Sequence, residues 1–168
     1  MTARNTETLL ALSIKQPWAS LVVLGLKTIE IRGWTTPIRG RIAIHTGKIP
    51  DDRPEGWARL GKEHAKLAAL RGGVIGVANL VDIITYRSSR HFAADRQLHC
   101  NESSWFAPPV LYGLRFEKPK IVPFSECSGQ VKFFSVEIEL EPRPQKKRSP
   151  KRIVSFELSP NRSRKVRP

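Results

Sequence analysis

The spacing of apolar and polar residues along the chain predicts six β-strands. Each is a short apolar run or an alternating stretch rich in Val, Ile and Phe, and Gly, Pro or polar residues flank it. One of them contains Gly76, which indicates a bulge or a close approach by another backbone. The strands are expected at residues 9–14, 28–32, 41–45, 74–86, 110–116 and 133–140.

Two further stretches change to the three-to-four spacing of helices. Residues 15–25 carry Pro17 in the first turn and end at Gly25, and residues 51–70 form one amphipathic pattern. His64 falls on the apolar face of the second pattern, so we expect it to be packed rather than catalytic. Residues 87–109 are irregular and form either a lid or a segment with a helix that the pattern does not place. The sequence therefore predicts an α+β domain with two or three helices.

The rest of the chain is organised around residues 25–32, which place charged groups among β-branched residues. In an extended strand Glu30 and Arg32 share one face, while Lys27 must lie in the turn before it. The three charges either hold a polar ligand through charge-assisted hydrogen bonds or neutralise one another.

Several other polar and aromatic residues are expected near this strand. Trp18 either packs in the core or stacks on a ligand, and the start of its helix would direct free N–H groups at an anion. His45 and Lys48 end the third strand and are expected beside Glu30. Asp82, an acid among Val and Ile, either pairs with a buried base or points outward at a bend.

Charge is the unusual feature of the composition. The formal net charge is +14 and the sequence pI is about 10.5, which favours an anionic partner, nucleic acid before membrane; the alternative is a solvated basic surface. Residues 142–168 hold ten basic residues and one acidic residue, or +9 of the total. This tail is expected to be disordered and to bind phosphate backbones without selecting a base sequence. Residues 146–152 also match a nuclear import signal.

The cysteine content and the hydropathy argue against a disulfide-rich, metal-binding or membrane-spanning protein. Cys100 and Cys127 form neither a disulfide framework nor a paired metal-ligand spacing, so we expect reduced thiols, no metal and no cofactor. No signal peptide is apparent, and no apolar run approaches the ~20 residues that cross a membrane. The chain is predicted to be soluble and cytoplasmic, or nuclear if its source is eukaryotic.

Three motifs together resemble a known family. They are the run at residues 12–19, the pattern Gly25-x-Lys27-x-x-Glu30-x-Arg32, and residues 40–45. This combination resembles the ASCH domain, a module named for homology to the activating signal cointegrator and a member of the PUA-like group. The resemblance implies a small mixed β-barrel of five or six strands over residues 9–141, with the tail at 142–168 outside it.

The resemblance also implies a function: a cleft that binds nucleic acid, RNA in preference to DNA, through a base or nucleotide. The basic rim would attract phosphate, while Glu30 accepts from a base amino group and a tryptophan stacks on the base. The candidate binding residues are Gln16, Trp18, Lys27, Glu30, Arg32, Trp34, Arg39, Arg41, His45 and Lys48.

Two other classes of function stay open. Some ASCH proteins hydrolyse N4-acetylcytidine with a Thr at the position of Glu30, and others are ribonucleases, for which Lys27 would stabilise phosphate while Glu30 or His45 moves protons. The binding interpretation is favoured over either hydrolase. A protein-interaction adaptor would instead use the apolar residues 153–156. The sequence does not choose between RNA and DNA, the preferred base or the oligomeric state.

Overall fold

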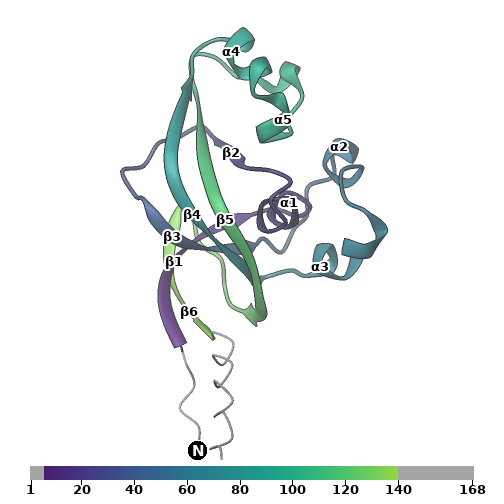
Figure 1. Ribbon diagram of the computed structural model, residues 1–168, viewed down its shortest axis with the longest axis vertical. Coiled ribbons are helices and arrows are strands. Elements are labelled where there is room, and N and C mark those ends of the chain that lie inside the picture. Colours follow the sequence, from purple (N-terminus) through teal and green to yellow (C-terminus); the bar gives the residue numbers. More distant parts are fainter. Residues whose placement is uncertain (1–5, 140–168) are drawn as a thin grey trace, which may run out of the picture.

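The computed structural model describes residues 6–139, which form a mixed α+β fold around one six-stranded sheet (Figure 1). The strand order is β2-β5-β4-β3-β1-β6. β1 and β3 are parallel, and the other neighbours are antiparallel. The strands are β1 Thr6–Ile14, β2 Ile29–Arg32, β3 Gly40–Thr46, β4 Gly73–Tyr86, β5 Leu111–Glu126 and β6 Phe133–Glu139.

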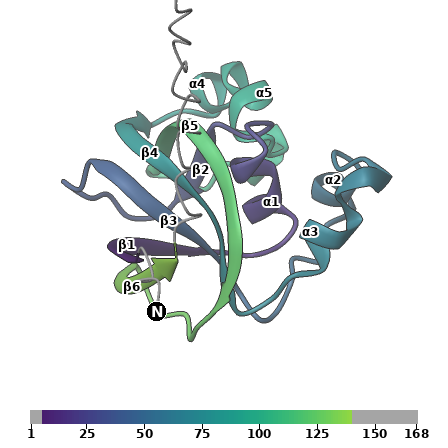
Figure 2. The same cartoon turned by 60° about the horizontal axis from the view of Figure 1, so that its bottom comes forward.

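Within residues 6–139 the sheet is open, which corrects the expectation of a closed barrel. β2 and β6 stand at the two ends of the hydrogen-bonded order. The long strands β4 and β5 nevertheless curve around helix α1, Trp18–Val23 (Figure 2). This curvature brings β2 toward β1, where Arg32 Nη2 donates to the Ser13 carbonyl at 2.8 Å. A side-chain hydrogen bond, rather than backbone pairing, therefore joins β2 to β1.

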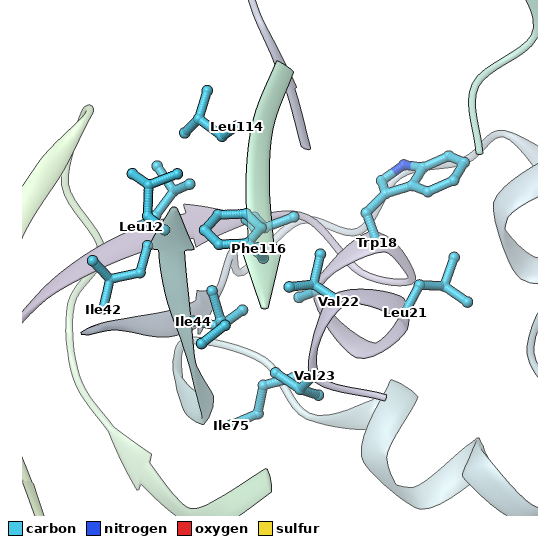
Figure 3. Close-up of a cluster of buried hydrophobic side chains, with 14 of the residues drawn as sticks. Leu12, Trp18, Leu21, Val22, Val23, Ile42, Ile44, Ile75, Leu114 and Phe116 are labelled. Carbon is cyan, nitrogen blue, oxygen red and sulfur yellow. The ribbon is translucent and has the colours of Figure 1, made fainter. Parts of the chain in front are cut away.

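The main core lies between α1 and the concave face of the sheet. Alternate residues of the strands point inward, and they gather around Phe116 with Val22 of α1 (Figure 3). Gly76 permits the close approach of the helix, since an added Cβ would lie 2.4 Å from Val23 Cγ1. The pairing of β4 with β5 also shifts register between Val74 and Gly76. The same Cβ would lie 2.7 Å from the Lys120 carbonyl oxygen of β5, so both the close approach of another backbone and the bulge are confirmed at Gly76.

The prediction of one continuous helix over residues 51–70 is wrong. The chain forms three short pieces there: α2 Pro54–Trp57, the 3-10 helix η1 Lys62–His64 and α3 Ala65–Ala69. Gly61 precedes η1 with an extended backbone, φ −69° and ψ 157°, which interrupts the helical hydrogen bonds between α2 and η1. His64 is consequently only partly buried, beside Glu63.

Residues 87–109 contain helices rather than an unstructured lid. They are α4 Ser89–Ala94, α5 Arg96–His99 and the 3-10 helix η2 Ser103–Trp105, at one end of β4 and β5 (Figure 1). Thr28 N–H donates to the Leu98 carbonyl at 2.9 Å, so this segment holds the turn before β2.

Strand β5 extends beyond its predicted end at Phe116. It continues through Pro119 and Pro123 to Glu126. β2 pairs only with residues 112–115 of β5, so the later part has β4 as its one partner among the described strands. Proline is tolerated on such an edge because a missing N–H leaves no ladder bond unmade. Asp82 is exposed at a register shift, 4.0 Å from Arg115, and so points outward.

Candidate functional site

Lys27 lies in the turn between α1 and β2, as its spacing from Glu30 predicted. The backbone N–H groups of Leu26 and Lys27 both donate to the Leu21 carbonyl, which fixes this turn. The Lys27 side chain is 1% exposed, and its Nζ donates to the His99 carbonyl. The same nitrogen lies 3.4 Å from Glu30 Oε2.

Burial dominates the electrostatics of this ammonium group. Desolvation lowers the pKa of Lys27, because a charge is costly in an apolar environment, and the Glu30 carboxylate opposes that shift. The Trp18 ring centroid, 5.4 Å from Nζ, adds a cation–π contact. Lys27 is therefore sealed behind the site rather than open to it.

Glu30 and Arg32 project from the same face of strand β2. Glu30 Oε1 is 3.3 Å from Arg32 Nη2, and the Glu30 side chain keeps 11% of its surface exposed. Arg32 Nε is buried and has no hydrogen-bond partner within residues 6–139. A buried donor without a partner is costly, so the hydrogen-bonding capacity of the Arg32 guanidinium is incompletely satisfied within these residues.

These two residues belong to the wall of a pocket of about 530 Å³, which we call the Glu30 pocket. The charged side chains around it are four basic and two acidic, so positive charge is in excess. The lining residues are Ser13, Lys15, Trp18, Glu30, Ile31, Arg32, Gly47, Lys48, Ile49, Asp51 and Arg53.

Sequence analysis missed Asp51 and Arg53 as site residues. Arg53 Nε donates to Asp51 Oδ1 at 2.8 Å, and the guanidinium carbon lies 4.1 Å from the Trp105 ring centroid. These hydrogen bonds from Arg53 hold the pKa of Asp51 well below its usual range. Residues 51–54 have the sequence Asp-x-Arg-Pro, which could have indicated a turn, but the sequence analysis assigned them to the helix predicted over residues 51–70.

Trp18 packs in the core, so the structure gives no support to its stacking on a ligand. The side chain is 5% exposed, and its ring meets Trp105 edge to face at 6.1 Å. Gly56 lies so close that an added Cβ would be 2.7 Å from the Trp18 ring. Only part of this indole reaches the wall of the Glu30 pocket.

Gln16 is fully buried away from the pocket. Its Nε2 donates to the Leu67 carbonyl at 3.1 Å, and its Oε1 accepts from the Ser20 hydroxyl at 2.7 Å. These bonds join the start of α1 to α3. The predicted anion site at this helix start is unsupported as well, because α1 has only six residues.

Three other candidates lie outside the Glu30 pocket. Trp34 packs edge to face on Phe133 at 5.8 Å, and Arg39 Nη1 donates to the Ile38 carbonyl at 2.8 Å. Arg41 Nη1 donates to Glu7 Oε2 at 2.6 Å on the sheet surface. Their predicted contacts with nucleic acid gain no support from these positions.

His45 lies beside a neighbouring pocket of about 460 Å³, which we call the His45 pocket. It shares Ser13, Gly47 and Lys48 with the Glu30 pocket, so the two are adjacent. Its lining residues are Ser13, His45, Gly47, Lys48, Ser128, Gly129, Gln130 and Val131. Sequence analysis expected His45 beside Glu30, whereas the structure places it in the adjacent pocket, which Glu30 does not line.

Within residues 6–139, no three His, Cys, Asp or Glu side chains gather in a way that could hold a metal ion. Cys100 is buried and Cys127 half-buried, and both are free thiols. No helix of the described part of the chain is long and apolar enough to cross a membrane.

A sequence model of the ASCH domain matches residues 12–122, about two thirds of the chain. The chain belongs to the ASCH domain family. The matched range contains the end of β1, all of β2 to β4, most of β5 and every residue of the Glu30 pocket. The family's region thus includes the site described above.

Curated relatives match this ASCH protein over a short stretch. Activating signal cointegrator 1 from Mus musculus is 60% identical over 40 residues, and that from Homo sapiens is 61% identical over 40 residues. The stretch is 23% of this chain and only 7% of each relative. The likeness is therefore to a small part of a much longer protein.

Solved structures share the fold at low sequence identity. Two single-substitution variants of the ASCH protein of Zymomonas mobilis give TM-scores of 0.50, with 16% and 17% identity. The alignments cover 70% of this chain and 74% or 72% of the other. The unsubstituted Zymomonas mobilis protein, with 18% identity over 70% of this chain and 72% of its own, gives 0.49.

Proposed function

We propose that this ASCH protein binds nucleic acid, RNA in preference to DNA, with one unpaired base or nucleotide in the Glu30 pocket. The supporting observation is a partly exposed carboxylate in a pocket whose rim is basic. A carboxylate accepts hydrogen bonds from the exocyclic amino groups of bases, while basic side chains favour phosphate.

The two ion pairs of Glu30 support this role. Lys27 lies at one carboxylate oxygen and Arg32 at the other, which holds the acceptor in a fixed orientation. Ile49, 73% exposed on the pocket wall, offers an apolar contact for the face of a base. A volume of about 530 Å³ is within the range of small-molecule sites.

Phosphate affinity would come from the pocket rim and from the basic tail. Lys15, Lys48 and Arg53 are exposed around the pocket. The tail at 142–168, with its net charge of +9, lies outside the described residues. We propose that the domain at 9–141 selects the base and that the tail adds affinity without selectivity.

The experiment measures binding of labelled single-stranded RNA and DNA homopolymers to the full chain at several salt concentrations. Glu30→Gln keeps the shape of the side chain and a carbonyl for Lys27 but adds a donor, so it should alter the order of base preference. Deleting residues 142–168 should weaken binding and flatten its salt dependence while that order stays the same.

Two lysines supply the matched control. Lys48 lines the pocket, whereas Lys66 is exposed on α3 and lines neither pocket. Lys48→Ala should reduce the salt slope for single strands by about 0.7, as expected for one lost phosphate contact, and Lys66→Ala should not. Equal effects of both variants, or a base preference that disappears with the tail, would contradict the proposal.

Incubating the full chain with the labelled RNA, and separately with N4-acetylcytidine, tests for hydrolysis. Intact RNA and intact N4-acetylcytidine after incubation support binding alone, whereas turnover that stops with Lys27→Ala would replace the proposal by a hydrolase. The geometry favours binding, because Lys27 Nζ is enclosed between Glu30 and the His99 carbonyl. The adaptor hypothesis concerns residues 153–156, which lie outside the described part of the chain.

A further inference from the structure

Ser13 and His45 form a polar pair that the proposed nucleic-acid contact does not require. They are register partners on the parallel strands β1 and β3, so their side chains leave the same face of the sheet. Ser13 Oγ lies 3.0 Å from His45 Nδ1. That is the geometry of a nucleophile beside a general base.

The second ring nitrogen determines which tautomer is present. His45 Nε2 is 3.1 Å from the Cys127 carbonyl oxygen, which can only accept a hydrogen bond. Nε2 must therefore carry the hydrogen, and Nδ1 keeps its lone pair. It follows that the Ser13 hydroxyl donates to Nδ1, the direction needed to remove its proton.

The imidazole is held in place and kept neutral by its surroundings. His45 is 1% exposed, and its ring packs edge to face on Phe134 at 5.5 Å. Burial lowers the pKa of His45, because the charged ring would lose its hydration. The Cys127 carbonyl thus occupies the orienting position that an acidic side chain occupies in a catalytic triad.

The Ser13 hydroxyl is accessible although its partner is buried. Ser13 is partly exposed and lines both pockets, at their shared wall with Lys48. Gly129 keeps this space open, since an added Cβ would lie 3.3 Å from Ser13 Oγ and 2.6 Å from His45 Cε1. Ser13 thus lies in the wall of both pockets, while its partner His45 lines only the His45 pocket.

We propose that Ser13 is a nucleophile and His45 its general base, for acyl transfer from a carboxylic ester that carries a negative charge. Lys48 lines both pockets together with Ser13, and Lys15 and Arg32 line the Glu30 pocket, so cationic side chains belong to the same pocket walls as Ser13. These cations would attract an anionic substrate and stabilise the oxyanion of a tetrahedral intermediate.

The proposed reaction proceeds in two steps. Ser13 Oγ bonds to the acyl carbon as its proton passes to His45 Nδ1, and the departing alkoxide takes that proton to leave an acyl-serine and an alcohol. Water then attacks the acyl carbon and gives a proton to Nδ1. Ser13 Oγ leaves and takes this proton back, which restores the pair and releases a carboxylic acid.

The test treats the full chain with a fluorophosphonate, which forms a serine–phosphorus bond and releases fluoride, and locates the adduct by peptide mass spectrometry. Ser104, exposed in η2, is the internal control. Ser13 should react about 100-fold faster than Ser104, the contribution of a positioned base. Equal rates at both serines would overturn the proposal whatever the variants show.

Variants and an ester pair test the roles separately. His45→Gln should remove the excess reactivity of Ser13, while Ser104→Ala should leave it unchanged. 4-Nitrophenyl hemisuccinate should be hydrolysed faster than neutral 4-nitrophenyl acetate, and Ser13→Ala should abolish both activities.

Labelling that persists in a folded His45→Gln protein, or ester turnover unchanged by Ser13→Ala, would contradict the proposal. None of these measurements requires nucleic acid, so failure of the binding proposal would leave them intact.

Discussion

The Glu30 pocket and the His45 pocket share a wall but differ in how their polar groups are satisfied. Around Glu30, charges pair with charges: Lys27, Arg32 and the Asp51–Arg53 pair are all ionic. Around His45 the key contacts are neutral, a serine hydroxyl and a backbone carbonyl. The first arrangement suits recognition of a polar ligand, while the second suits movement of a proton.

The difference also concerns what is buried. The Glu30 pocket has a buried ammonium behind its carboxylate, so removing one partner leaves a charge without compensation. The His45 pocket has a buried neutral ring, for which loss of a partner is less costly. The predictions below test this contrast, from the largest expected effect to the smallest.

Glu30→Ala should destabilise the protein by about 3–5 kcal/mol, since the Lys27 ammonium would remain buried without its carboxylate. Glu7→Ala is the matched control, because it removes a carboxylate that pairs with Arg41 on the surface at 2.6 Å. That variant should lose less than about 1 kcal/mol. Urea unfolding of both variants measures the two losses, and a similar loss in each would show that burial of Lys27 is not the deciding factor.

Gly129→Ala should cost about 1–3 kcal/mol, because the new methyl group would lie 2.6 Å from His45 Cε1 and force the ring or the loop to move. Gly47→Ala places its methyl group 3.7 Å or more from its neighbours and should stay within about 0.5 kcal/mol. Thermal unfolding of the pair checks this difference. If both glycines tolerate alanine equally, the His45 pocket is looser than its geometry indicates.

Acidification should reveal the buried neutral histidine. The pKa of His45 is lowered from the ordinary 6.5, so between the two values the unfolded chain binds more protons than the folded one. Stability is therefore retained above pH 6.5 and falls as the pH drops through the folded pKa. His45→Gln should lessen this fall, and His99, whose pKa burial also lowers, should account for part of what remains. Unfolding curves at several pH values measure the loss of stability in both the original protein and the His45→Gln variant. Identical pH profiles of the two proteins would exclude His45 as a contributor.

Local patterns predicted the strands well but the charged groups only in part. Apolar runs and alternating stretches located all six strands, and the odd spacing of Lys27 from Glu30 correctly placed Lys27 in a turn. The same pattern could not show that the His99 carbonyl, far along the chain, would enclose the ammonium. The helical spacing of residues 51–70 also predicted one continuous helix there. Asp51 and Arg53 were assigned to that helix and were therefore not recognised as pocket residues.

The sequence by itself determined the strands, the turn before β2 and the charged pattern that marks the family, because these depend on neighbouring residues and on the period of two in a strand. Only the tertiary structure decided which polar groups face a pocket. Lys27 became sealed and Ser13 became paired with His45 because segments distant in the chain meet there: α5 over the turn, and β1 beside β3. These tertiary contacts determine how deeply each side chain is buried. The burial in turn determines the ionisation of each charged group and the reactivity of the hydroxyl.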